Sequence, residues 1–179
     1  MYIREANSAD FKDIMAIEKE AFYSEDVADL VSQLLADKSA EPVVSLLAFK
    51  DNEAVGHILF TRAMIDARRL SPSIYILAPL AVKPDHQRQG IGGMLITEGL
   101  KKLKEMKVEM VFVLGHEDYY PRYGFIPDAG SLGFIAPFPI PNKNANAWMV
   151  QALTSKGLSK VRGMIVCADP LNKPEHWRE

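Results

Sequence analysis

The chain has 179 residues, of which 48% are hydrophobic and 25% are charged, and its formal net charge is −2. This length and composition fit one ordinary globular protein with a core of its own. A nucleic-acid binder is excluded because it would need a basic stripe, whereas the densest lysine cluster, in residues 101–107, is offset by neighbouring glutamates.

The first third of the sequence predicts a strand, two helices and a β-hairpin. Residues 1–5 are short and alternating, and cap residues then precede apolar side chains at helical spacing over residues 11–21. Residues 26–37 repeat this helical pattern. Two β-rich runs, residues 43–49 and 54–64, are joined by four polar residues, which is typical of a hairpin.

The middle of the chain predicts a strand, a helix and a second, parallel strand. Residues 73–82 are long and apolar enough for a central strand. Pro79 interrupts this run, and because proline cannot donate to a ladder, we expect the sheet to be locally open there. A glycine-bearing turn leads into an apolar helix face over residues 91–106, where Gly99 predicts a close approach of the helix to the sheet. The strand at residues 110–114 completes a right-handed crossover unit.

The last third of the chain is less regular. Residues 127–146 are rich in proline, glycine and asparagine and predict an ordered loop with exposed Phe134 and Phe138. Two final strands, which we expect to be antiparallel, follow at residues 148–153 and 164–167.

The predicted elements indicate a single domain over residues 1–179, because no repeat, low-complexity tract or linker divides it. Residues 127–179 form the C-terminal loop and strands of that domain. The fold class is α+β (mixed α/β), with a mixed central sheet and helices on both faces.

The turn between residue 82 and the following helix has the character of an anion-binding site. A helix start leaves about four backbone N–H groups without partners and carries the positive end of the helix dipole. Glycine removes side chains that would keep phosphate oxygens away. The neighbouring polar side chains either add donors and charge or are solvated surface: Lys83, His86, Gln87 and Arg88.

Two common phosphate loops do not match this turn. There is no Gly-Lys-Ser/Thr ending, so a nucleotide P-loop is absent. A dinucleotide fingerprint needs a small residue three positions after Gly92, where Leu95 stands, and normally follows the first strand of its unit. Taken alone, the turn is also compatible with a glycine-rich connection that binds nothing.

Two motifs, taken together and in order, carry a family resemblance. The first combines a strand ending in Leu-x-Val with the pattern Arg/Gln-x-x-Gly-x-Gly/Ala, on Leu80, Ala81, Val82, Gln87, Arg88, Gln89, Gly90, Ile91 and Gly92. In the second, Tyr120 lies four residues before Gly124 and Phe125. Over residues 1–126 the chain resembles the GNAT superfamily of acetyl-CoA-dependent N-acetyltransferases. Residues 79–82, combined with residues 114–116 and 119–125, make it look like a largely uncharacterised prokaryotic subgroup of predicted acetyltransferases.

The resemblance implies where acetyl-CoA binds. In this superfamily the strand corresponding to residues 73–82 splays from the strand corresponding to residues 110–114, and pantetheine lies in the gap against strand backbone. Amides at the start of the following helix hold the pyrophosphate. The cofactor-binding residues that the resemblance implies are Leu80, Ala81, Val82, Gln87, Arg88, Gln89, Gly90, Ile91, Gly92 and Gly93.

The resemblance also assigns catalytic roles. Tyr120 matches the tyrosine that protonates the departing thiolate, which suits a phenol with a pKa near 10 facing a thiol with a pKa of about 8.5. Its alternative role is aromatic packing, the role that we expect for Tyr119 and Tyr123. His116 is the candidate general base, although a lone histidine beside a turn is also a structural hydrogen-bond partner. Val113 replaces an asparagine common in relatives, which leaves one cofactor contact unassigned.

We therefore expect direct transfer of the acetyl group from acetyl-CoA to a primary amine of an unidentified acceptor, without a metal. The alternative is a non-catalytic acetyl-CoA sensor with the same fold, against which the intact Tyr120 argues. A hydrolase is excluded because no nucleophile elbow is present. Acceptor contacts are expected in residues 22–37, 64–72 and 127–146.

The location and partners follow from composition. Cys167 is the only cysteine, so an intrachain disulfide and cysteine-rich zinc sites are excluded. The N-terminus is too polar for a signal peptide, and no apolar run reaches the roughly 20 residues of a membrane span. We expect a cytoplasmic protein with no nucleic-acid or membrane partner, and a homodimer is left open.

Overall fold

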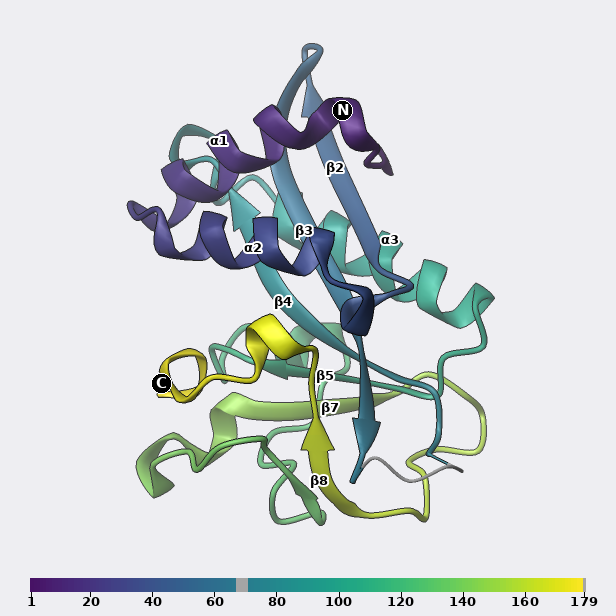
Figure 1. Cartoon of the computed structure of the whole chain (residues 1–179). Helices are drawn as coiled ribbons and strands as arrows, with labels where there is room; N and C mark the ends of the chain where they lie inside the picture. The colour runs from purple at the N-terminus through teal and green to yellow at the C-terminus, as the bar shows by residue number, and fades with distance from the viewer. Residues whose placement is uncertain (67–70, 179) are drawn as a thin grey trace.

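A mixed β-sheet lies between two layers of helices in the computed structural model, which describes residues 1–66 and 71–178 (Figure 1). The strands are β1 (Tyr2–Glu5), β2 (Val44–Lys50), β3 (Glu53–Ile65), β4 (Ile74–Val82), β5 (Met110–Leu114), β6 (Phe134–Ile135), β7 (Trp148–Ala152) and β8 (Gly163–Val166). The α-helices are α1 (Phe11–Phe22), α2 (Asp26–Ala36) and α3 (Ile91–Glu105). Part of the expected acceptor segment 64–72, namely residues 67–70, lies outside the described residues.

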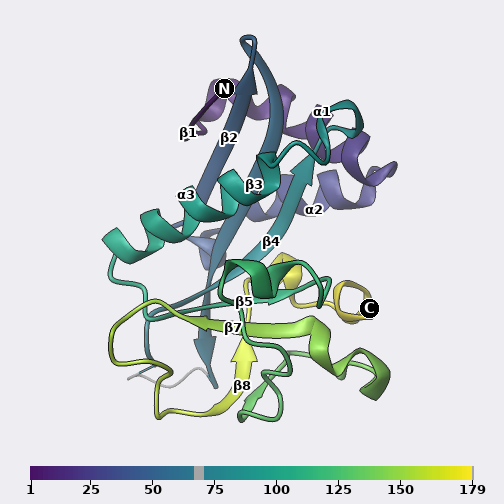
Figure 2. The same ribbon diagram turned by 180° about the vertical axis from the view of Figure 1, so that it is seen from behind.

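The strands of the main sheet follow the order β1-β2-β3-β4-β5-β7. The β4–β5 pair is parallel and is connected through α3, whereas the other neighbours in this order are antiparallel. The expected hairpin is β2–β3, and the expected crossover unit is β4-α3-β5. Helices α1 and α2 cover one face, and α3 covers the other (Figures 1 and 2). The predicted fold class is confirmed.

The sheet splits between its two parallel strands. Pairing runs from Ile74 opposite Met110 to Leu77 opposite Val113, and β4 then continues to its end without a β5 partner among the described residues. Pro79 lies just past the last pair, where a bulge also shifts the register between β3 and β4. A proline costs no ladder bond where the ladder is already interrupted. The local opening expected at Pro79 is therefore confirmed.

Two hydrophobic clusters lie on opposite faces of the sheet. The cluster on the α1–α2 face includes Ile17 and Leu34, and the cluster on the α3 face includes Phe60 and Leu95. Gly99 in α3 lies directly over the Phe60 ring, with which an added Cβ would collide. The predicted close approach of helix and sheet is therefore present.

The loop after residue 126 differs from the sequence prediction. Phe134 was expected to be exposed but is fully buried, because β6 pairs with β8 and folds this loop against the sheet. Its ring contacts Phe112 edge-on, and its carbonyl accepts a 2.8 Å hydrogen bond from the Trp148 indole. Phe138 is half-buried against the same cluster. These contacts make the predicted exposure of Phe134 wrong.

The two final strands are both present, and each is antiparallel to a different neighbour. β7 pairs with β5, whereas β8 pairs with Met64 and Ile65, the last two residues of β3, which lie just past its pairing with β4. Among the helices described in residues 1–66 and 71–178, none is long and apolar enough to cross a membrane.

Candidate functional site at the split strands

Helix α3 begins without a side-chain cap in the described structure. Its N-cap residue is Gly90, which has a left-handed backbone (φ 82°) and supplies no side chain. The N–H of Met94 donates to the Gly90 carbonyl at 3.1 Å, so the N–H groups before Met94 precede the first helical bond. These donors and the positive end of the helix dipole make an anion-binding position.

The loop before α3 is held by the side chains of its two glutamines. Gln87 Nε2 donates to the Val82 carbonyl at 2.9 Å, and Gln89 Nε2 donates to the Asp85 carbonyl at 3.2 Å. Lys50 Nζ donates to Gln89 Oε1 at 2.8 Å. The glutamine side chains therefore shape the loop, and the backbone is left to meet a ligand.

Two basic side chains beside this loop differ in their surroundings. Arg88 is exposed and has a left-handed backbone (φ 60°), a conformation that is uncommon for a residue with a side chain. Lys83 instead pairs with Glu53 at 2.8 Å. Arg88 is therefore available to an anion, whereas the charge of Lys83 is already balanced.

The glycines of the first helical turn make room for two tyrosines. A Cβ on Gly92 would lie 2.6 Å from the Tyr119 hydroxyl, and one on Gly93 would collide with the Tyr123 hydroxyl. A Cβ on Gly90 would meet nothing within 4 Å among the described residues. Open space for phosphate oxygens therefore lies at Gly90, whereas Gly92 and Gly93 let the tyrosines approach.

The tyrosines belong to an aromatic cluster around the short 3-10 helix Tyr120–Tyr123. The Tyr119 ring contacts those of Tyr120 and Tyr123 edge-on, at centroid distances of 5.2 and 5.3 Å. Burial, followed by a hydrogen bond with Tyr123, raises the pKa of Tyr119 to about 12. The Tyr119 hydroxyl is thus protonated at neutral pH and lies at the start of α3, a placement that the packing role expected from the sequence did not predict.

Tyr120 lies beside the end of β5. Its side chain is buried, and its ring packs so closely on Gly115 that an added Cβ there would collide with it. The ring also contacts Phe125, the residue that ends the second sequence motif. Gly124, with φ 97°, ends the short helix between them.

The two histidines considered as bases lie in different environments. His116 is exposed, and its carbonyl accepts the N–H groups of Tyr119 and Tyr120 at 3.1 and 3.4 Å. His57 is fully buried under α1, with Nδ1 2.6 Å from Glu18 Oε1 and Nε2 2.8 Å from Ser45 Oγ. The structure thus places His116 near Tyr120 and removes His57 from the surface.

The end of β4 completes the site. Leu80, Ala81 and Val82 pair with β3 on one edge, and their other edge has no described β5 partner. Leu80 and Val82 are half-buried, and a Cβ on Gly92 would lie 3.5 Å from Leu80 Cδ2. Ile91, the first residue of α3, is buried. The free edge of β4 and the uncapped start of α3 are therefore adjacent.

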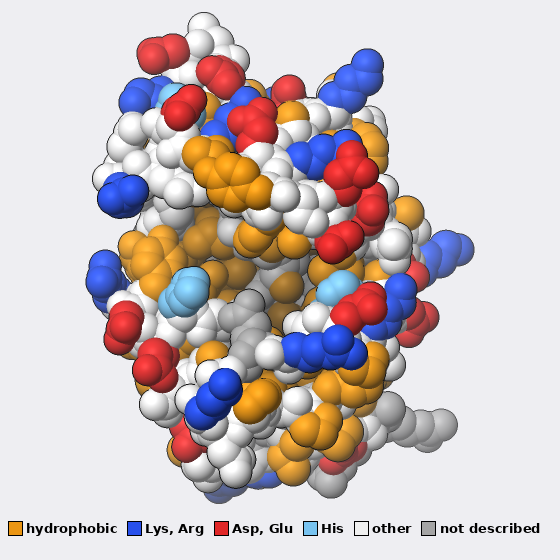
Figure 3. All heavy atoms as spheres, turned by 90° about the vertical axis from the view of Figure 1, so that its left-hand side faces the viewer, with side chains coloured by type: hydrophobic (Ala, Val, Ile, Leu, Met, Phe, Trp, Pro, Cys, Tyr) orange, Lys and Arg blue, Asp and Glu red, His pale blue; other side chains and the backbone are white. Residues whose placement is uncertain are grey.

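Two surface features accompany this arrangement. A cavity of about 540 Å³ lies against Gly90, Gly93 and Tyr123. Figure 3 shows the side of the molecule that lies on the left in Figure 1. This surface is hollowed near its middle, with hydrophobic side chains inside the hollow and histidine side chains at its rim. No group of three or more histidine, cysteine or acidic residues in the described ranges is placed to hold a metal ion.

A family model and a curated protein that are similar to this chain both describe acetyltransferases. The model of the acetyltransferase (GNAT) family matches residues 9–125. The uncharacterised N-acetyltransferase YjhQ of Escherichia coli K12 is 49% identical over 164 residues, which cover 92% of this chain and 90% of that protein.

Two solved structures are similar over nearly the whole fold. The GNAT family N-acetyltransferase YhbS of Escherichia coli in complex with CoA has a TM-score of 0.86 and 26% identity, covering 96% of this chain and 92% of that one. A GNAT family acetyltransferase of Brucella melitensis in complex with acetyl-CoA has a TM-score of 0.76 and 26% identity, covering 95% and 97%.

Proposed function

The chain belongs to the acetyltransferase (GNAT) family, and we propose that this N-acetyltransferase moves the acetyl group of acetyl-CoA directly to a primary amine. The observation that carries the proposal is the uncapped start of α3 beside the free edge of β4. One feature offers donors to phosphate oxygens, and the other offers strand backbone to the amides of pantetheine. The two similar solved structures contain CoA and acetyl-CoA, which supports this assignment.

In the proposed complex the pyrophosphate lies over Gly90, where space is open. Its oxygens accept hydrogen bonds from the backbone N–H groups of residues 88–93. Arg88 adds a positive charge at the same place. The pantetheine arm runs along Leu80 to Val82 and brings the thioester to the point where β4 and β5 part. This end of the gap also lies beside Tyr120, because Tyr120 packs against Gly115 just after β5.

The proposed chemistry is one addition followed by one collapse. The neutral amine nitrogen attacks the thioester carbonyl, and its excess proton leaves to the candidate base His116, directly or through water. Collapse of the tetrahedral intermediate breaks the C–S bond and expels the CoA thiolate. Tyr120 donates its phenolic proton to that sulfur, which gives CoA and the N-acetylated product.

Release of CoA from acetyl-CoA in the presence of a panel of amines, peptides and aminoglycosides tests the function. We expect release to exceed the acetyl-CoA background for some amines. Intact-protein mass spectrometry with acetyl-CoA alone should show no acetylated enzyme, because transfer is direct. A protein that binds CoA by calorimetry yet releases none with any amine would be the sensor alternative. The cytoplasmic location and a homodimer stay predictions of the sequence.

A further inference from the structure

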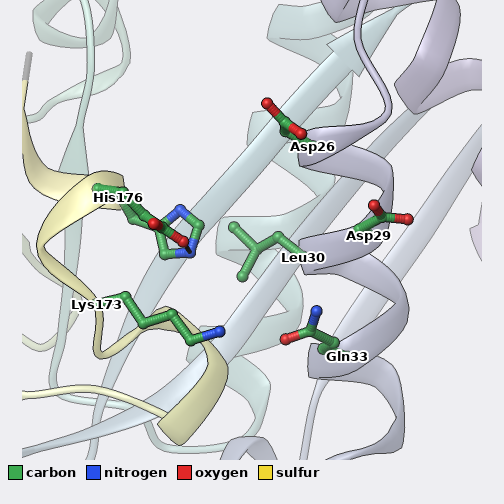
Figure 4. A pocket seen from close by; sticks show the side chains of 7 residues that line it. Asp26, Asp29, Leu30, Gln33, Lys173 and His176 are labelled. Carbon is green, nitrogen blue, oxygen red and sulfur yellow. Dashed lines mark ion pairs between the residues drawn. The ribbon is translucent and has the colours of Figure 1, made fainter.

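A cleft opens between α2 and the C-terminal segment, which comprises residues 169–178 (Figure 4). Its volume is about 400 Å³, which lies within the range of small-molecule sites, about 300–1,000 Å³. Leu30 of α2 forms an apolar part of its wall, and His176 faces it from the C-terminal segment (Figure 4). The two walls come from parts of the chain that are far apart in the sequence.

The C-terminal segment lies where β4 and β5 part, on the α1–α2 face (Figures 1 and 2). Trp177 is buried, and its ring contacts Trp148, which pairs with Leu114 at the end of β5. Leu114 and Ala78, the residues just past the last β4–β5 pair, pack against the same hydrophobic cluster as both tryptophans. The cleft is therefore on the opposite face of the sheet from α3 and close to the split.

His176 is the central polar group of the cleft. Its side chain is 21% exposed, and Nε2 lies 3.8 Å from Glu175 Oε1. Burial lowers the pKa of the imidazole, and the negative charge of Glu175 only partly opposes this shift. The ring is therefore neutral at pH 7 and keeps one nitrogen that can accept a hydrogen bond.

Charge is distributed unevenly along the cleft. Asp26 lies at one end, and Lys173 and Gln33 lie at the other (Figure 4). Glu175 and Asp29 line the cleft as well, although the Asp29 carboxylate points away from its middle (Figure 4). With His176 neutral, the carboxylates of the described lining residues outnumber the ammonium of Lys173, so the cleft favours a cationic ligand.

We propose that this cleft binds the acetyl acceptor, and that the acceptor is a small aliphatic amine with a second cationic group. The inference rests on the proposed acetyl transfer. Asp26 and Glu175 bind the distal cationic group of the acceptor. His176 accepts a hydrogen bond from an N–H of that group. The reacting amine points to the split between β4 and β5, where it attacks the thioester as described above.

Probes that differ only in distal charge test the ligand class. We would compare 1,5-diaminopentane, pentylamine and 5-aminopentanoate, measuring kcat/KM for CoA release at saturating acetyl-CoA. The diamine should exceed pentylamine by about tenfold, and the aminopentanoate should be the poorest substrate. Equal kcat/KM values for the three probes would overturn the proposal.

Variants that remove a single charge show which residues cause the preference for the diamine. Glu175→Gln and Asp26→Asn should each reduce the preference for the diamine about threefold or more, through KM rather than kcat. Glu20→Gln, which removes an exposed carboxylate of the neighbouring helix α1 that is not among the lining residues, is the matched control and should leave the preference within twofold. His176→Leu should raise KM for the diamine while the CoA dissociation constant stays unchanged. A control variant that acts as strongly as Asp26→Asn would remove the cleft from the explanation.

Binding without turnover keeps the two proposals apart. In a titration of the wild-type protein with 1,5-diaminopentane, the ring 13C–1H resonances of His176 should shift with saturation, and those of His57 should not. Absence of that shift, with CoA binding intact by calorimetry, overturns the acceptor cleft alone. Absence of CoA binding overturns the proposed function, while the same titration still decides whether the cleft binds a cation.

Discussion

On the α3 face of the sheet, close contact depends on missing side chains, whereas on the α1–α2 face it depends on side chains that meet from distant segments. Gly92, Gly93 and Gly99 admit tyrosine or phenylalanine groups against α3. On the other face, Glu18 of α1 reaches His57 of β3 through the core. The first kind of site leaves a local glycine pattern in the sequence, and the second kind leaves none.

Because of this difference, we expect substitutions on the two faces to have different effects. Changes on the α3 face near the start of the helix should act on cofactor affinity, because the backbone itself forms that site. Changes among the buried side chains of the α1–α2 face should act first on stability. Single substitutions test that division, from the largest expected effect to the smallest.

The largest effect is expected from Glu18→Ala on the α1–α2 face. Both Glu18 and His57 are fully buried, and the variant leaves His57 Nδ1 without its partner. Removal of this side chain leaves a cavity and an unsatisfied buried polar group, which together cost about 3 kcal/mol or more. Denaturant unfolding measures the loss, and Glu18→Gln is the control that keeps a side-chain oxygen. A loss in CoA affinity with unchanged stability would contradict the division between the faces.

Tyr120→Phe should affect the chemical step. The variant removes only the hydroxyl and keeps the ring contacts with Tyr119 and Phe125. Loss of a general acid lowers kcat by about a hundredfold or more, with little change in the CoA dissociation constant or in Tm. A packing role gives the reverse pattern, near-normal kcat with a lower Tm. Turnover within about threefold of wild type, with chemistry rate-limiting, would remove Tyr120 from the mechanism.

Gly90→Asp should weaken CoA binding by about tenfold, or 1.4 kcal/mol. An added side chain at Gly90 enters open space, and aspartate tolerates the left-handed backbone better than most residues. Gly90→Asn is the neutral control of the same shape, and calorimetry measures both affinities. Equal affinities for the two variants would place the phosphates elsewhere. Gly92 is a poorer test position, because a side chain there meets Tyr119 first.

The smallest effect is expected at the start of α1. Asp10 accepts hydrogen bonds from Arg4 at 2.7 and 2.8 Å and from the Asn7 N–H at 2.8 Å. These contacts, that with Arg4 foremost, lower the pKa of Asp10 to about 2. Asp10→Asn should cost about 1 kcal/mol or less at neutral pH, as loss of a partly exposed ion pair does.

The pH dependence of this effect has a defined sign. A carboxylate with a lowered folded-state pKa stabilises the fold above its unfolded pKa of about 3.9, and this contribution fades as the pH falls toward 2. The difference in Tm between wild type and Asp10→Asn should therefore be largest above pH 5 and shrink toward pH 2. A difference independent of pH would show that the charge is not involved.

The sequence predicted those features that depend on local patterns. The turn ending at Gly90, the opening at Pro79 and the close approach at Gly99 all follow from the backbone needs of single residues. The buried position of Phe134 was missed, because it depends on pairing between β6 and β8. The sequence left the position of Trp177 open, because its contact with Trp148 joins segments that no local pattern connects. One domain over the whole chain stays a prediction.

The free edge of β4 has a consequence for solubility as well as for binding. An open strand edge is a template on which another chain can add a strand, and proteins commonly protect such edges with proline. Pro79 lies just past the last β4–β5 pair and has no backbone N–H to offer to an incoming strand. The same residue that keeps the gap open for a ligand thus discourages self-association through it. In a Pro79→Ala variant, the ligand-free protein should aggregate more readily than the ligand-bound protein.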